Sequence, residues 1–316
     1  MKRRELISYG LCCLTAIPLS VRCAQTNLES LKSLETTDQK GAQAKNEIAP
    51  DASDSAFRFI AVGDVGTGDR RQYAVAQSMN RWRSLSPFST ALLTGDNIYE
   101  SGEIKRIHQV FERPYASLLS HGVKFHAVLG NHDVQTNQGE DEIAYAGYNM
   151  SARYYTFVRQ SVQFFALDTN QIDDAGRRHR AIAWDTQLQW LKTELKRSPA
   201  PWKIVFAHHP VYSSGAHGSN RDLAKDLAPI FKEYGVQLYM NGHDHNYERT
   251  ESIDGTVYIT SGNGAKLRQV SKSDWTAHAS TQLGFTAVDV YRDRITIKAV
   301  NLDHAVYDQA DIVRSL

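Results

Sequence analysis

Cysteine is scarce in this sequence, and its placement limits what it can do. The chain of 316 residues contains three cysteines, Cys12, Cys13 and Cys23, and all of them lie near the N-terminus. They fall within a segment that we interpret below as a leader, so the mature chain would keep few or none. Internal disulfides therefore cannot stabilise the folded part, which has to rely on its hydrophobic core.

An excess of charge of one sign is also missing. The formal net charge is +1, and the body of the chain has no long block of Lys or Arg. Nothing in this balance indicates a surface that binds nucleic acid. Hydrophobic residues make up 41% of the chain, enough for a substantial core in one large domain or two ordinary ones.

The chain has one long apolar stretch, and it is short for a membrane span. Basic residues at positions 2–4 precede the stretch from Leu6 to Val21, which is the layout of a secretory signal. A retained membrane anchor is the alternative, but Gly10 and Pro18 interrupt the stretch. We therefore expect residues 1–24 to be a secretory signal, and the protein to be secreted or periplasmic with no stable membrane span after the signal is removed.

A polar segment separates this leader from the folded part. Residues 25–55 are rich in Gln, Asn, Ser, Thr, Lys and Glu, which predicts a flexible tether. From residue 56 to residue 316, short apolar runs alternate with segments that carry apolar residues at helical spacing, as in an α/β domain. We predict buried strands at 57–62, 91–94, 125–129, 164–167, 204–207 and 238–240, and helices at 72–85, 104–119, 185–196 and 222–234.

The C-terminal part changes character. Residues 256–260, 285–291 and 294–300 are typical of strands; Asp254-Gly255 marks a turn before the first, and only two residues separate the last two. We therefore expect a second, more antiparallel sheet. Two mixed sheets packed face to face with helices outside would give a four-layer α-β-β-α sandwich.

Oxygen and nitrogen donors follow five of the predicted strands directly. Loops at strand ends can turn several side chains toward one point while the strands hold them still. Carboxylate, amide and imidazole groups together suit hard or borderline cations. The donors occur in the segments Gly63-Asp64-Val65-Gly66, Gly95-Asp96-Asn97-Ile98-Tyr99, Gly130-Asn131-His132, Val205-Phe206-Ala207-His208 and Gly242-His243-Asp244-His245.

These five motifs, in this order, resemble those of the purple acid phosphatases in the calcineurin-like metallophosphoesterase superfamily. The similarity runs from about Phe57 to the C-terminus. The segment 207–213, Ala-His-His-Pro-Val-Tyr-Ser, followed by His217-Gly218, is similar to the small mammalian-type, tartrate-resistant members. The resemblance implies an acid phosphatase that hydrolyses phosphate monoesters through a metal-activated hydroxide at a binuclear Fe(III)–M(II) centre, active at acidic to neutral pH.

The resemblance also implies seven side-chain ligands for the two ions. The family pattern gives a ferric site of Asp64, Tyr99 and His245, with Asp96 bridging to a divalent site of Asn131, His208 and His243; the divalent ion is Fe, Zn or Mn. Tyr99 argues for iron, because a phenol with a pKa of about 10 becomes a good ligand only when a strongly polarising cation removes its proton.

Two further histidines match positions that line the substrate pocket of the family. His132 and His217 are candidates to protonate the leaving group. The alternatives are that His132 orients Asn131, and that His217 is an ordinary residue of a Gly- and Ser-rich loop. The role of His209 and of the loop from Gly139 to Tyr155 stays open. Asp133 and Asp244 flank predicted ligands, and we interpret them as residues that orient ligands or cap turns.

Two other functions remain as alternatives. The first is a phosphodiesterase or nucleotide hydrolase with a Mn or Zn pair, against which Tyr99 argues. The second is an inactive surface-binding protein on the same fold, against which the complete set of seven ligands argues. We expect the partners to be small phosphorylated substrates and not nucleic acid. The sequence defines neither the physiological substrate nor the oligomeric state.

Overall fold

The computed structural model describes residues 56–170 and 183–314. The predicted secretory signal and the predicted tether lie outside these residues. Within the described part, no helix combines the length and the apolar character that crossing a membrane would require.

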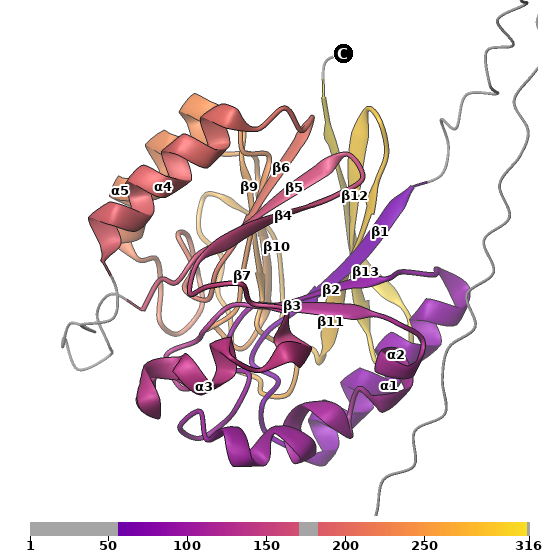
Figure 1. The fold of residues 1–316 in the computed structure, drawn as a ribbon. Helices are drawn as coiled ribbons and strands as arrows, with labels where there is room; N and C mark the ends of the chain where they lie inside the picture. The colour runs from indigo at the N-terminus through magenta and orange to yellow at the C-terminus, as the bar shows by residue number, and fades with distance from the viewer. Residues whose placement is uncertain (1–55, 171–182, 315–316) are drawn as a thin grey trace, which may run out of the picture. The chain divides into compact units, whose positions relative to one another are not determined.

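Two mixed sheets form the centre of the domain (Figure 1). The first sheet has the strand order β13-β12-β11-β1-β2-β3, and the second has the order β10-β8-β9-β7-β6-β5-β4. The strands of the first sheet are β1 (Phe57–Val62), β2 (Thr90–Leu93), β3 (Lys124–Ala127), β11 (Gly284–Val290), β12 (Arg294–Asn301) and β13 (Val306–Val313). Those of the second are β4 (Tyr155–Arg159), β5 (Val162–Ala166), β6 (Trp202–Phe206), β7 (Leu238–Asn241), β8 (Tyr247–Thr250), β9 (Val257–Ser261) and β10 (Thr276–Ser280).

Aromatic side chains fill the space between the sheets. Phe59 of β1 packs edge-on against Phe164 of β5, with ring centroids 5.1 Å apart, and Phe157 of β4 stacks on Phe164 at 4.8 Å. Each fully buried phenylalanine contributes roughly 1.5–3 kcal/mol by leaving water. This contact fixes the two sheets against each other and so fixes the ends of their strands.

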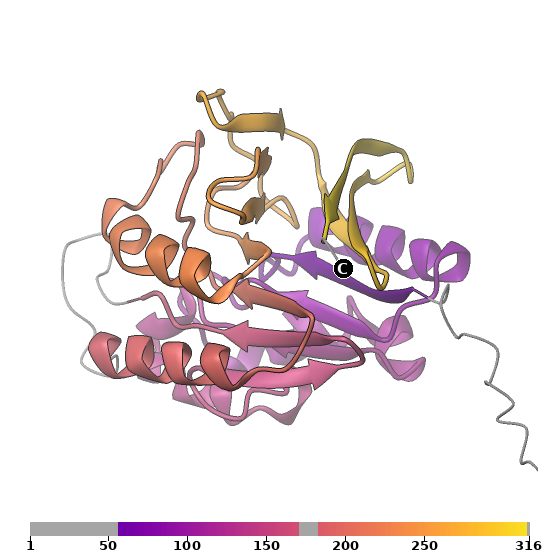
Figure 2. The same ribbon diagram turned by 90° about the horizontal axis from the view of Figure 1, so that it is seen from above.

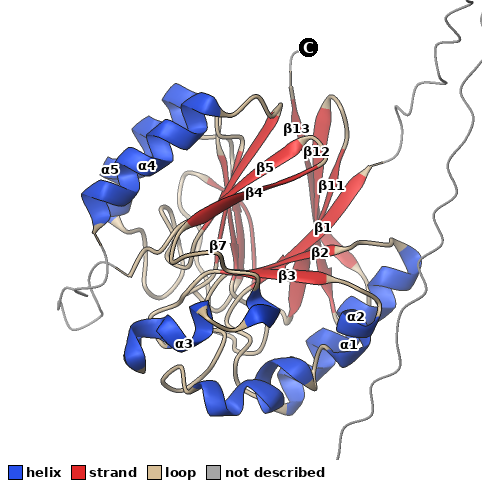
Figure 3. Cartoon of the chain, in the orientation of Figure 1, coloured by secondary structure: helices blue, strands red, loops and turns tan. Residues whose placement is uncertain are grey.

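Helices cover the two outer faces (Figures 2 and 3). On the first sheet, Trp82 of α1 (Arg70–Leu85) packs edge-on against Phe285 of β11. On the second, leucines of α4 (Trp184–Arg197) and α5 (Arg221–Tyr234) form a buried cluster with Phe165 and Val205. The predicted fold class is therefore confirmed. The remaining helices are short: α2 (Ala116–Ser120), α3 (Glu140–Ile143) and the single turns 104–106, 108–112, 133–135, 137–139 and 146–148.

The predicted helix at 104–119 is wrong as a continuous element. It is divided into a 3-10 turn at Ile104–Arg106, a π-helical turn at His108–Glu112, and α2. Pro114 explains the break, because proline has no backbone N–H to donate and its ring clashes with the preceding turn.

The predicted C-terminal strands divide between the two sheets. β9 lies parallel to β7 in the second sheet, whereas β11 pairs antiparallel with β1 in the first. All seven residues of β11 are buried, so this strand belongs in the interior of a sheet that is covered on both faces. The turn at Asp254-Gly255 and the short connection between β11 and β12 are both present.

Candidate metal centre

The predicted donors come together because the parallel strands that precede them end at the same edge of each sheet. β1, β2 and β3 run parallel in one sheet, and β6 and β7 run parallel in the other. Backbone hydrogen bonds join the turns: the Gly63 N–H donates to the Ser261 carbonyl at 2.8 Å, and the Gly242 N–H to the His208 carbonyl at 3.0 Å. A Cβ at Gly242 would lie 2.5 Å from Asp64 Oδ2, so only glycine permits this approach.

Three predicted ligands have left-handed backbone conformations that residues other than glycine rarely adopt. The φ angles are 59° at Asp64, 54° at Asp96 and 70° at His243. Each such conformation costs about 1–3 kcal/mol, and residues of this kind concentrate at functional sites. The backbone of these turns therefore orients the ligand side chains at a cost in stability.

The first donor cluster consists of Asp64, Tyr99 and His245. The Tyr99 hydroxyl lies 3.2 Å from Asp64 Oδ1 and 3.3 Å from His245 Nε2, and the last two atoms are 3.4 Å apart. All three residues are buried. A carboxylate, a phenol and an imidazole thus converge on one point, and this is a donor set for a hard cation.

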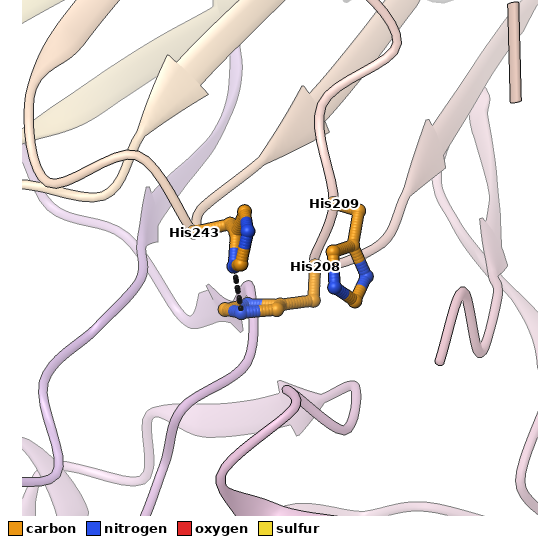
Figure 4. A group of neighbouring side chains, drawn as sticks. All are labelled: His208, His209 and His243. Atoms are coloured by element: carbon orange, nitrogen blue, oxygen red, sulfur yellow. Dashed lines mark hydrogen bonds between the residues drawn. The ribbon is translucent and has the colours of Figure 1, made fainter. Parts of the chain in front are cut away.

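The second donor cluster consists of Asn131, His208 and His243. Asn131 Oδ1 lies 3.0 Å from His208 Nε2 and 3.1 Å from His243 Nδ1, and the two histidine nitrogens are 3.2 Å apart. Figure 4 shows the rings of His208 and His243 turned toward each other. Two imidazoles and an amide oxygen suit a borderline divalent cation.

Asp96 stands between the two clusters. Its Oδ1 lies 3.4 Å from His208 Nε2, and the Asp64, Asp96 and His245 ligand atoms are within 4.8 Å of one another. Burial opposes ionisation of Asp96, but His208 and His132 outweigh it and hold its pKa below the usual range. Its Oδ1 also accepts the His132 N–H at 3.1 Å, and an ionised carboxylate in this position can present one oxygen to each cluster.

The hydrogen bonds around the second cluster fit a bound cation. His208 Nδ1 lies 2.9 Å from the Thr94 carbonyl, which can only accept, so a neutral ring has its proton on Nδ1. Burial and the neighbouring histidines lower the pKa of His243 well below its usual value, which keeps that ring neutral. Burial also lowers the pKa of His208, but the charges of Asp96 and Asp64 outweigh it and raise this pKa above its usual value. A cation between His208 Nε2 and Asn131 Oδ1 would favour the neutral His208 ring and accept the lone pairs of both atoms.

The first cluster also fits a cation, and a strongly polarising one. Burial, followed by the charges of Asp64 and Asp96, raises the pKa of Tyr99 well above 10. Without metal the phenol keeps its proton. Its use as a ligand requires an ion able to remove that proton, as ferric iron is.

His132 is oriented toward this centre. Its ring Nδ1 lies 2.5 Å from the Glu100 carbonyl and must donate to it, which leaves Nε2 directed toward Asp96 Oδ2, 3.9 Å away. Its ring also packs edge-on against that of Tyr99. His132 is partly exposed, so one of its nitrogens faces both the centre and the solvent from which a substrate arrives.

His217 reaches the opposite cluster. Its ring centroid lies 4.1 Å from that of His243, and its backbone N–H donates to Asp244 Oδ1 at 3.0 Å. Asp244 also accepts from Ser213, so this carboxylate shapes the loop that carries His217. His217 is thus brought to the centre.

His209 lies beside the second cluster, with its ring centroid 4.5 Å from that of His243 (Figure 4). Its ring Nδ1 and its backbone N–H both contact the Thr169 hydroxyl, at 2.9 and 3.1 Å. Together with His208 and His243 it forms a group that could hold a metal. Because Nδ1 of His209 is hydrogen-bonded to Thr169, the ring is better suited to a place beside the cluster than to binding a metal.

A buried carboxyl pair supports the ligand turns: Asp133, which the sequence indicated as an orienting residue, and Glu142, which it did not indicate. Asp133 accepts backbone N–H groups from Asn97 at 2.9 Å, Ile98 at 3.0 Å and Gly130 at 2.7 Å, which joins the turns after β2 and β3. The Asn97 side chain donates to both Asp133 and Glu142. Burial and Asp96 raise the pKa of Asp133 to about 6, and burial and Asp133 raise that of Glu142 well above its usual range.

This pair predicts how the stability of the metal-free protein depends on pH. The folded state binds more protons than the unfolded state between the ordinary pKa of Glu142, 4.5, and its raised value, so stability falls as pH rises through that window. As pH rises from 4.5 toward that raised value we expect a loss of up to about 1.4 kcal/mol per pH unit, and a shallower loss in Glu142→Gln. Urea unfolding of both proteins measures this, and equal slopes would contradict it.

Comparison with known proteins agrees with this geometry. The family model described as calcineurin-like phosphoesterase matches residues 57–247. Purple acid phosphatase 17 of Arabidopsis thaliana is 32% identical over 242 residues, which are 69% of this chain and 71% of the relative. Tartrate-resistant acid phosphatase type 5 of Rattus norvegicus is 31% identical over 239 residues, 66% of this chain and 73% of the relative.

The fold recurs in a solved structure of a protein with another role. GAP50, described as the anchor in the inner membrane complex of Plasmodium, aligns with a TM-score of 0.70 over 83% of this chain and 90% of that one. Its sequence is 20% identical, so this likeness concerns the fold alone. From the family match and the two relatives together, the chain belongs to the calcineurin-like phosphoesterases and, within them, to the purple acid phosphatases.

Proposed function

We propose that this chain hydrolyses phosphate monoesters with two cations held by seven side chains. As a purple acid phosphatase it is a metal-dependent phosphoric monoester hydrolase. The observation that carries the proposal is the pair of largely buried donor clusters with Asp96 between them. In the proposed centre, Asp64, Tyr99 and His245 hold ferric iron, Asn131, His208 and His243 hold divalent Fe, Zn or Mn, and Asp96 bridges.

The two cations, when bound, would supply Lewis acidity that offsets the charge of the phosphate and makes a water a better nucleophile. The other tasks belong to the side chains. His208 is held in one tautomer by the Thr94 carbonyl, which keeps Nε2 available. Asp133 fixes the turns that carry Asp96, Tyr99 and Asn131, so that the donors are in place before substrate arrives.

His132 is the proposed proton donor to the leaving group. Its Nδ1 is committed to the Glu100 carbonyl, so the proton on Nε2 is the one that can move. His217 lies against the other cluster and is proposed to contact the phosphate or its leaving group. The two histidines would then flank the bound ester.

A comparison of ester classes tests this function against the diesterase alternative. We expect 4-nitrophenyl phosphate to be hydrolysed with a kcat/KM at least about 100-fold above that of bis(4-nitrophenyl) phosphate, because a monoester has one more non-bridging oxygen free for the centre and one more negative charge. We also expect the optimum to lie at acidic to neutral pH. A preference for the diester, or an alkaline optimum, would contradict the monoesterase with an iron site.

The alternative function is an inactive surface-binding protein, and GAP50, described as an anchor, shares the fold of this chain. A protein that uses the fold only as a binding surface has no reason to keep strained ligand turns. The φ angles at Asp64, Asp96 and His243 therefore favour the enzyme.

We further propose that residues 1–24 direct export, that residues 25–55 are a tether, and that 56–316 form the catalytic domain of a secreted or periplasmic protein.

A further inference from the structure

The segment that follows β9 is fixed beside both ligand-bearing sheets. The Gly264 N–H donates to the Gly63 carbonyl at 3.2 Å, and the Arg268 N–H donates to the His245 carbonyl at 2.8 Å. Gly63 and His245 each belong to a turn that carries a predicted ligand. The residues between these two anchors, among them Lys266, are therefore held at the centre by backbone contacts.

Lys266 lies against the first cluster. Its Nζ is 3.4 Å from the centroid of the Tyr99 ring, and the side chain is half-buried. Among the described residues, no carboxylate forms an ion pair with it. A cation over an aromatic face gains roughly 0.5–1 kcal/mol at a partly exposed site, but the ring does not neutralise its charge. The ammonium group therefore remains an uncompensated positive charge beside Tyr99.

Arg268 lies against the second cluster. Its guanidinium contacts His217 Nε2, and the ring of His217 in turn packs on that of His243. The side chain is exposed, and no ion pair joins it to an acidic group in the part of the chain that the structure describes. A guanidinium has five N–H donors, so most of them stay available to an incoming anion.

These two cations are unfavourable beside the proposed centre unless an anion joins them. A ferric and a divalent ion carry more positive charge than Asp64, Asp96 and a deprotonated Tyr99 can neutralise, so Lys266 and Arg268 are repelled by the loaded site. A phosphate monoester bound to the metals offsets the charge of the metals. A second negative group on the same substrate would offset that of the two side chains.

We propose that Lys266 and Arg268 form a cationic rim that binds a second anionic group of the substrate, close to the phosphate that is removed. This inference rests on the proposed phosphatase function and adds a preference to it. Esters whose leaving group carries a carboxylate or a further phosphate are then better substrates than esters with a neutral leaving group. The rim selects substrates and takes no part in bond cleavage.

A matched pair of substrates tests the rim. 3-Phosphoglycerate has a carboxylate where glycerol 3-phosphate has a hydroxymethyl group, and the two are otherwise alike. For the holoenzyme we expect 3-phosphoglycerate to have the higher kcat/KM. In Lys266→Gln with Arg268→Gln, we expect its kcat/KM to fall about tenfold, mainly through KM, while that of glycerol 3-phosphate changes less than about threefold. The preference should also shrink as salt is added.

The double variant Lys272→Gln with Arg292→Gln is the control, because it removes the same two charges at exposed positions elsewhere. We expect it to keep the preference of the wild type. Equal losses of kcat/KM on both substrates in the Lys266 and Arg268 double variant would contradict the proposed rim. A wild type with the same kcat/KM for the two substrates would contradict it as well. If the wild type hydrolyses neither these two substrates nor 4-nitrophenyl phosphate, the proposed function itself fails.

Discussion

Asp96→Asn is expected to lower kcat/KM for phosphate monoesters by on the order of 10³-fold or more. Asp96 lies between the two donor clusters, with Oδ1 3.4 Å from His208 Nε2 and its ligand atom within 4.8 Å of those of Asp64 and His245. An amide of the same size keeps the packing but loses the charge and one of the two equivalent oxygens. Steady-state assays with metal analysis measure both consequences, and we expect the metal content to fall with the activity.

The control for this substitution is Asp303→Asn, which makes the same chemical change at an exposed turn between β12 and β13. It should leave activity and metal content unchanged. If Asp96→Asn folds, as judged by circular dichroism, and retains wild-type activity, Asp96 does not bridge two metals. If neither the wild type nor the variant is active, the chain is a binding protein on a phosphatase fold.

His132→Asn is expected to lower kcat by an amount that depends on the leaving group. A proton donor contributes about 10²–10⁴-fold when the departing alkoxide is a strong base, and little when the departing group is already stable as an anion. We therefore expect a loss of about 100-fold or more with glycerol 3-phosphate and a loss under about fivefold with 4-nitrophenyl phosphate. The metal content should stay at the wild-type value, because His132 is not among the seven proposed ligands.

A role for His132 in orienting Asn131 makes the opposite prediction. Loss of an orienting group would lower the rate by the same factor for both esters and would reduce the content of the second metal. His121→Asn, at an exposed position in the turn after α2, is the control and should change neither quantity. Equal factors for the two esters would remove His132 as the proton donor.

Much of the centre was predictable because each donor is adjacent in sequence to the strand that holds it. Asp64 follows β1 by two residues and His208 follows β6 by two, so a buried apolar run with a polar end locates both. Parallel pairing then brings the ends together without further information from the sequence. The glycines before the donors are equally visible, and Gly242 is required by the close approach of Asp64.

The supporting residues were not predictable in the same way. Glu142 lies 45 positions from its partner Asn97, and Thr169 lies 40 from His209. Such contacts depend on how irregular loops fold over the strand ends, and no local pattern encodes that. Lys266 likewise meets Tyr99 only through the path of the segment after β9.

The errors in the fold have visible causes. Pro114 stands within the segment that we expected to be one helix, and its effect was underestimated. The predicted strands lack β4, β8, β10 and β13. Of these, β4, β10 and β13 lie at the edges of their sheets, where most side chains are exposed or half-buried and give little apolar signal. Neither error displaces the strand ends that carry the donors.

The most direct test of the proposed centre is an absorption spectrum with metal analysis on the wild type and on Tyr99→Phe, with Tyr73→Phe, an exposed tyrosine of α1, as the control. We predict about two metals per chain, including iron, and a visible band that is lost in Tyr99→Phe and kept in Tyr73→Phe. A colourless, active wild type carrying zinc or manganese would contradict the iron site held by Tyr99, and a wild type that is inactive and binds no metal would contradict the two-metal centre.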